Sequence, residues 1–297
     1  MKHDMQTGGG SARRLLAFGG GVDSTAILAA YLDPAGAAKA SGTPETKLRQ
    51  VLRSSPLSGA VFADPGAEFR ATYRNVRTAA RLCLRHGLTF TTVYKRTADG
   101  RRLRIQDWLL KNGTIPVMPG GHHVCSLKFK GQQLQQWAGR AFAGDSIEWL
   151  IGIEAEEQHR QKRFQPDPAA RHQAIYPLVL LGWDRRTCER IIEACWPHAV
   201  RKSSCVFCPF MSEPEILALF QDDPEAGDLA RQIETRFSET SPIKHQAWID
   251  GGRQLDAAGR APRGQWKKDS WAAGARLFTA TVDGRRLTAA EWQRRAA

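Results

Sequence analysis

A glycine-rich run between an apolar strand and a helix constrains this chain more than any other feature. Residues 15–18 are apolar and lead directly into three glycines, and a helical stretch over residues 25–32 follows. Glycines at such a turn let the backbone approach a ligand closely and direct several N–H groups at one point. The helix N-terminus adds a partial positive charge there. The pattern predicts a phosphate site, although a turn that binds nothing can carry the same glycines. The predicted binding residues are Phe18, Gly19, Gly20, Gly21, Val22, Asp23, Ser24 and Thr25.

The order of the expected elements predicts an α/β fold. Strands are expected over residues 58–63, 88–94, 146–153 and 175–180, and helices over 69–86, 127–142 and 184–195. Strands that alternate with helices favour a parallel twisted sheet with helices on both faces. Residues 33–55 are Ala- and Gly-rich and are interpreted as an inserted loop with a helix.

Three regions are expected along the chain. Residues 1–12 are predicted to be a flexible arm, and residues 13–210 a nucleotide-binding domain that includes a cysteine metal site. Residues 211–297 are predicted to be a basic and mainly helical extension. That extension contains a hairpin around Asp283-Gly284 and a helix opened by a capping box from Thr288 to Glu291.

Composition narrows the class of protein. The chain has 297 residues, 42% of them hydrophobic, which indicates a globular protein. No apolar run reaches the roughly 18 residues of a membrane span, so we expect a cytoplasmic protein without a membrane partner. The net charge of +13 favours a nucleic-acid partner, unless it reflects only a general preference for arginine. One basic group comprises Lys95, Arg96, Arg101, Arg102 and Arg104.

Three of the six cysteines form a candidate metal site. Cys205 and Cys208 stand in a Cys-x-x-Cys turn, and Cys125 lies in a separate loop. A Cys-x-x-Cys alone suits zinc, a redox disulfide or an iron–sulfur cluster. Two close cysteines in a chain of this length favour metal or redox chemistry over a disulfide framework.

Residues 19–24 resemble the Ser-Gly-Gly-x-Asp-Ser loop of the PP-loop ATP pyrophosphatase superfamily. Gly20, Gly21, Asp23 and Ser24 match that loop, and Gly19 stands where the superfamily has its first serine. The resemblance implies an adenine nucleotide alpha-hydrolase-like fold and a loop that holds the phosphates of ATP or the phosphosulfate of a sulfonucleotide.

Two further segments resemble the phosphoadenosine-phosphosulfate and adenylyl-sulfate reductases. Residues 61–69 are similar to the Asp-Thr-Gly-x-Glu-Phe segment of these enzymes, which implies that Asp64 binds a ribose hydroxyl or Mg²⁺. Residues 150–160 look like their Gly-Ile-Arg-x-x-Glu-x-x-x-Arg region. Arg160 is then a candidate phosphate clamp, and Glu154 stands in place of the first arginine.

The cysteines extend this resemblance. Residues 125–128 resemble the Cys-Cys-x-x-x-Lys segment of adenylyl-sulfate reductases, with Val124 in place of the first cysteine. Cys125, Cys205 and Cys208 would then hold a [4Fe–4S] cluster with one open iron. Two alternatives remain open: Cys188 or Cys195 supplies a fourth ligand, or His122 or His123 completes a zinc site.

The absence of any cysteine after Cys208 shifts the expected function. The reductases without a cluster carry a nucleophilic C-terminal cysteine, which this chain lacks. We therefore expect an ATP pyrophosphatase that adenylates tRNA or DNA for sulfur transfer, with ATP, Mg²⁺ and the cluster as cofactors. Asp23, Lys128 and Arg160 are the predicted catalytic residues. The partners would include a sulfur donor or thiol reductant, and a homodimer is compatible with this interpretation.

Two other functions fit the same residues. The first is a reductase-like enzyme that acts on a small sulfonucleotide. The second is a non-catalytic protein that binds ATP and nucleic acid and has a structural zinc ion.

Overall fold

The computed structural model describes residues 12–117, 123–157, 171–250 and 276–297, and the chain divides into two compact units. The first unit comprises residues 1–64, 69–93 and 131–203. The second comprises residues 65–68, 94–130 and 204–297, so the boundary predicted after residue 210 falls inside it. The predicted arm lies almost entirely outside the described residues.

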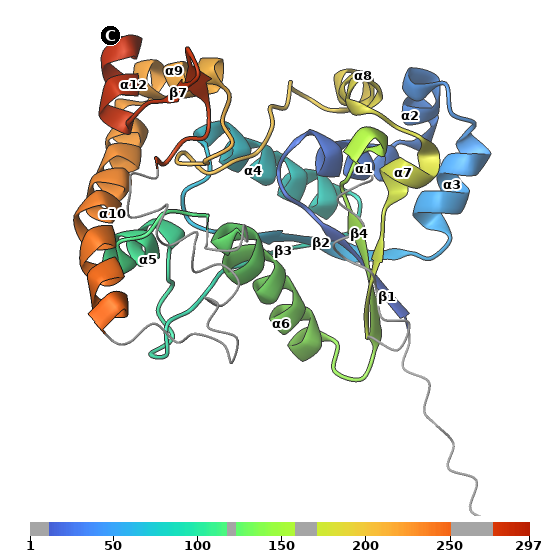
Figure 1. Cartoon of the computed structure of the whole chain (residues 1–297). Helices are drawn as coiled ribbons and strands as arrows, with labels where there is room; N and C mark the ends of the chain where they lie inside the picture. Colours follow the sequence, from blue (N-terminus) through green and yellow to red (C-terminus); the bar gives the residue numbers. More distant parts are fainter. Residues whose placement is uncertain (1–11, 118–122, 158–170, 251–275) are drawn as a thin grey trace, which may run out of the picture. The chain divides into compact units, whose positions relative to one another are not determined.

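The first unit is built on a parallel sheet of five strands in the order β3-β2-β1-β4-β5 (Figure 1). Each recorded pairing within this sheet is parallel. The predicted α/β class is therefore confirmed. The strands are β1 (Ala12–Ala17), β2 (Leu57–Ala63), β3 (Thr89–Val93), β4 (Ser146–Ile151) and β5 (His172–Ile175).

Successive residues of a strand point to opposite faces of a sheet, so apolar strand residues lie on both faces here. Helices cover both of these faces. Leu16 and its neighbours on one face pack with residues of α1, α4 and α8. Leu15 and its neighbours on the other face pack with α6 (Figure 1). The helices of this unit are α1 (Val22–Leu32), α2 (Pro34–Ser41), α3 (Glu45–Arg53), α4 (Arg70–Arg85), α6 (Gln132–Ala141), α7 (Pro177–Leu181) and α8 (Arg185–Cys195).

Two sequence-based expectations for this unit are wrong. The strand expected over residues 175–180 ends at Ile175, and Pro177 opens the short helix α7. Proline is favoured at the first helical position because it has no N–H to leave unpaired. Residues 33–55, expected to form an inserted loop with a helix, contain two helices, α2 and α3.

Within its described residues the second unit is mainly helical. Its chain contains α5 (Ile105–Asn112), the π-helix η1 (Cys125–Gly131), α9 (Glu213–Asp222), α10 (Pro224–Asp250), β6 (Thr281–Val282), β7 (Arg285–Arg286) and α12 (Ala289–Ala296). The buried carboxylate of Glu234 in α10 accepts hydrogen bonds from the N–H groups of Leu277 and Ala289, at 2.8 and 2.6 Å. These bonds anchor the C-terminal segment to α10.

The predicted hairpin and capping box are both present. Asp283 and Gly284 have φ of 50° and 77°, which suits the two-residue turn of a hairpin. Thr288 and Glu291 form a reciprocal capping box at the start of α12. Among the helices that the structure describes, none combines the length and apolarity of a membrane span.

The capping box makes stability depend on pH. The backbone N–H of Thr288 and the side chain of Arg285 lower the pKa of Glu291 to about 2. The unfolded value is about 4.3, so the stabilisation is fully present above that pH and is lost as the pH falls toward 2. We expect Glu291→Gln to melt at a lower temperature than wild type at pH 7 and at the same temperature near pH 2. A melting difference that stays constant across this range would contradict the assignment.

Candidate functional site

The glycine loop joins β1 to α1. Gly20 has φ of 75°, a left-handed backbone that favours glycine, and Gly21 is the N-cap residue of α1. The Ser24 hydroxyl accepts a hydrogen bond from the Gly19 N–H at 3.1 Å, and the Thr25 hydroxyl donates to the Gly21 carbonyl at 2.7 Å. Both hydroxyls therefore shape the loop itself. The helix begins at Val22, earlier than the sequence pattern indicates.

Asn75 holds this loop from α4. Its buried amide donates to the Gly20 carbonyl at 3.0 Å and to the Thr25 hydroxyl at 2.8 Å. The Trp196 indole N–H donates to the amide oxygen of Asn75 at 2.8 Å. Sequence reasoning missed Asn75, because a single polar residue in an amphipathic helix gives no local sign of what it faces.

Ser203 lies directly against the loop and was also missed. A Cβ atom added to Gly21 would lie 2.8 Å from the Ser203 Oγ and 3.0 Å from its backbone nitrogen. The first distance is shorter than real Cβ contacts and the second is tighter than most of them, so a larger residue here would force Ser203 to shift. Two of the three glycines are therefore favoured by the structure, Gly20 by its backbone angle and Gly21 by this close approach.

The strand order places the loop at a recognised type of ligand site. The strand order reverses between the neighbours β1 and β4, and open α/β sheets bind ligands beyond the carboxyl ends of the strands at such a point. Asp64 follows β2 at the same edge of the sheet. Its buried carboxylate accepts a hydrogen bond from the Tyr73 hydroxyl at 2.9 Å.

Charged side chains gather where β4 ends. The Arg185 guanidinium lies 2.8 Å from an Asp23 carboxylate oxygen and 3.5 Å from a Glu154 oxygen. Burial raises the pKa of Glu154, the charge of Arg185 opposes that shift, and the charge of Asp23 adds to it. Neither Glu154 nor Arg185 was predicted to be a site residue, since only the sheet topology brings them to the glycine loop.

The cysteine turn belongs to the second unit. The Cys208 N–H donates to the Cys205 carbonyl at 2.9 Å, and Cys205 forms an antiparallel bridge with Glu68. The buried Glu68 carboxylate pairs with the Lys130 ammonium at 2.7 Å. Burial and the charge of Glu68 raise the pKa of Cys205 well above its ordinary value.

Cys125 lies at the start of η1, near enough for its charge to act on Cys205 and Lys130. Electrostatic interaction thus links Cys205 to both Cys125 and Cys208, the other two cysteines that the sequence singled out. Within the described ranges, however, no three His, Cys, Asp or Glu side chains are positioned as a group that could hold a metal ion. The metal site stays a prediction.

The other predicted residues have different surroundings. The Lys128 ammonium lies 5.3 Å from the ring centroid of Trp108, and the lysine paired with Glu68 is Lys130. Arg160 and His122 lie outside the described residues. The ring of His123 packs against Phe210, with centroids 4.6 Å apart. Cys188 and Cys195 both lie in α8 of the first unit.

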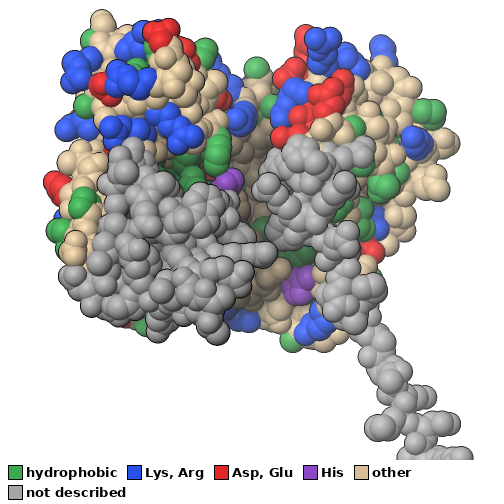
Figure 2. All heavy atoms as spheres, viewed as in Figure 1, with side chains coloured by type: hydrophobic (Ala, Val, Ile, Leu, Met, Phe, Trp, Pro, Cys, Tyr) green, Lys and Arg blue, Asp and Glu red, His purple; other side chains and the backbone are tan. Residues whose placement is uncertain are grey.

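Basic side chains gather on the second unit. Figure 2 shows lysine and arginine side chains over the C-terminal hairpin and α12, at the upper left of the view. The exposed arginines there are Arg285, Arg286, Arg294 and Arg295. A second basic group surrounds Tyr94, whose ring centroid lies 4.6 Å from the Arg96 guanidinium and 5.2 Å from that of Arg102. These surfaces suit a polyanionic partner.

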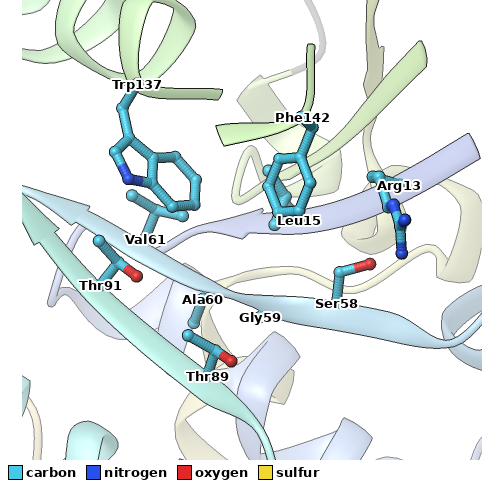
Figure 3. Close-up of a pocket in the computed structure, with 10 residues that line it drawn as sticks. All are labelled: Arg13, Leu15, Ser58, Gly59, Ala60, Val61, Thr89, Thr91, Trp137 and Phe142. Carbon is cyan, nitrogen blue, oxygen red and sulfur yellow. The ribbon is translucent and has the colours of Figure 1, made fainter. Parts of the chain in front are cut away.

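A hollow of about 260 Å³ lies elsewhere in the first unit, between α6 and the sheet (Figure 3). Trp137 and Phe142 close one side of it, and Leu15, Val61 and Thr91 line the sheet. Its charged lining residue, Arg13, pairs with Asp145 at 2.7 Å. The glycine loop does not line this hollow, and its lining residues offer no catalytic chemistry.

Comparison of the chain with protein-family models and with curated proteins found no match. The geometry therefore defines the class of protein only as an α/β protein with a glycine loop at the reversal point of a parallel sheet.

Proposed function

We propose that the chain is a PP-loop ATP pyrophosphatase that adenylates a nucleic acid for sulfur transfer. The observation that carries the proposal is the glycine loop at the strand-order reversal, where the backbone angle of Gly20 and the close approach of Ser203 to Gly21 favour glycine. A loop of this kind, followed by a helix N-terminus, suits the phosphates of a nucleotide. The basic surfaces of the second unit support a nucleic-acid partner, either tRNA or DNA.

The proposed reaction has two displacements. An oxygen of the nucleic acid attacks the α-phosphorus of ATP, a new P–O bond forms, and the bond to pyrophosphate breaks. Sulfide from a sulfur donor then displaces AMP and takes the place of that oxygen. The loop N–H groups would stabilise negative charge on the phosphates, and Asp64 would bind a ribose hydroxyl. Lys128 and Arg160 remain the cationic catalytic residues that the sequence predicts.

The three cysteines provide soft thiolate donors that suit an iron–sulfur cluster, with zinc as the alternative. When bound, a cluster with an open iron would supply sulfide in a reactive form. The Glu68–Lys130 pair would hold the Cys205 turn in place beside it.

The test is release of pyrophosphate from ATP by protein purified without oxygen. We expect pyrophosphate and AMP to form in equal amounts, and only when RNA or DNA is added. Binding of the nucleic acid should weaken steeply as salt increases, because basic residues release counterions from phosphates. Sulfite release from adenylyl sulfate would instead support the reductase, and ATP binding without turnover would support the non-catalytic protein. Either result would overturn the proposal.

A further inference from the structure

The glycine loop uses its own hydroxyl groups internally. The Ser24 hydroxyl accepts from the Gly19 N–H at 3.1 Å and lies 3.4 Å from the Gly21 carbonyl. The Thr25 hydroxyl donates to the same carbonyl at 2.7 Å. Each hydroxyl has a single proton to donate, and in both cases it is directed at the loop backbone. The loop therefore offers a phosphate its N–H groups but no hydroxyl of its own.

A hydroxyl from a distant part of the chain lies beside this loop. The Ser203 Oγ is 2.8 Å from the position that a Cβ atom on Gly21 would take, and 3.9 Å from the corresponding position on Gly19. The backbone nitrogen of Ser203 is 3.0 Å from the same point on Gly21. Among the residues that the structure describes, none accepts a hydrogen bond from the hydroxyl or the N–H of Ser203. Ser203 is half-buried, so two donors of one residue are accessible at the loop.

The segment that leads to Ser203 is held against α4. The Trp196 indole N–H donates to the Asn75 side chain at 2.8 Å, and a ring nitrogen of His198 lies 3.1 Å from the Thr78 hydroxyl. Trp196 is also buried. These contacts fix the position of the segment before any ligand binds. A donor that is already in place loses less conformational entropy on binding, which favours affinity.

The groups around Ser203 favour an anion as the ligand. Arg201 and Lys202 directly precede it, and both are exposed. Phosphate oxygens only accept hydrogen bonds, so they suit a place where a hydroxyl, an N–H and the loop N–H groups all donate. Hydrogen bonds to such charged oxygens are roughly twice as strong as those between neutral groups.

We propose that Ser203 is a ligand-binding residue of the first unit, and that its hydroxyl and N–H donate to a phosphate group held by the glycine loop. The inference rests on the proposed function of the loop as a nucleotide site. It adds a donor that no motif near the loop contains. The phosphate is then bound by two segments of the chain, the loop after β1 and the segment after α8.

The test compares the ligand affinity of Ser203→Ala with its stability. Calorimetry measures binding of inorganic pyrophosphate and of ATP, and both should weaken by roughly tenfold to a hundredfold, as expected for a lost hydrogen bond to a charged group. Urea unfolding without ligand should match that of wild type, because the hydroxyl bonds to no described residue. Ser24→Ala gives the contrast: its hydroxyl bonds to the Gly19 N–H, so this variant should unfold at a lower urea concentration.

Ser204→Ala is the matched control, because it removes the same group from the next residue, which is also half-buried. It should bind both ligands as wild type does. The proposal is overturned if Ser203→Ala keeps wild-type affinity, if Ser204→Ala loses as much, or if Ser203→Ala is unstable, which would show a structural role; the proposed function survives these results. Pyrophosphate binding without ATP binding would contradict the proposed function and leave the role of Ser203 intact. Wild type that binds neither ligand would overturn both.

Discussion

Cys205→Ser is expected to lose completely the metal that we propose the second unit to bind. Cys205 is buried against Glu68, and its thiol interacts electrostatically with Cys125 and Cys208. Serine oxygen is a poor ligand for iron–sulfur clusters and for zinc, which favour thiolate sulfur. Iron, zinc and acid-labile sulfide would be measured on protein purified without oxygen. Wild type should contain iron and sulfide, and the variant almost none.

Cys195→Ser provides the control for this experiment. Cys195 is half-buried at the end of α8 in the first unit, and its thiol interacts with Asp33. A serine hydroxyl can keep that interaction, so the variant should retain the wild-type metal content. Equal metal content in Cys205→Ser and wild type would contradict the assignment, as would a wild-type protein that binds no metal.

Gly20→Ala is expected to destabilise the first unit and to abolish ATP binding. A left-handed backbone costs an alanine about 1–2 kcal/mol. The added methyl group would also lie 2.8 Å from the Thr72 Cγ2, and such overpacking typically costs a further ~1–3 kcal/mol. Urea unfolding measures the first effect, and calorimetry with ATP measures the second.

Gly42→Ala separates the two causes. Gly42 has φ of 72°, nearly that of Gly20, but nothing lies within 4 Å of the position its Cβ would take. This variant should therefore show only the backbone cost of about 1–2 kcal/mol and should bind ATP normally. If the two variants lose the same stability and both bind ATP, the close packing of the loop on α4 has no functional role.

The sequence alone determined those features whose cause is local. The helix expected over residues 184–195 is α8, and the side chain of its N-cap residue Asp184 accepts a hydrogen bond from the Thr187 N–H at 2.8 Å. The turn at Asp283-Gly284 and the capping box of α12 were predicted for the same reason. In each case residues close in sequence supply the capping hydrogen bonds or the backbone angles of the turn, so a short stretch of sequence is enough to predict the feature.

Only the tertiary structure decided which distant residues complete the sites. The placement of β4 beside β1 brings Glu154 to Asp23, and the packing of α4 brings Asn75 to Gly20. Glu68 likewise pairs with Lys130 and not with the predicted Lys128. Which of these two lysines faces Glu68 depends on the π-helical backbone of η1. These contacts join residues separated by 50 or more positions, and their energy depends on burial and strand pairing. Local pattern can therefore predict the glycine loop, but the charges that surround it follow from the order of the strands.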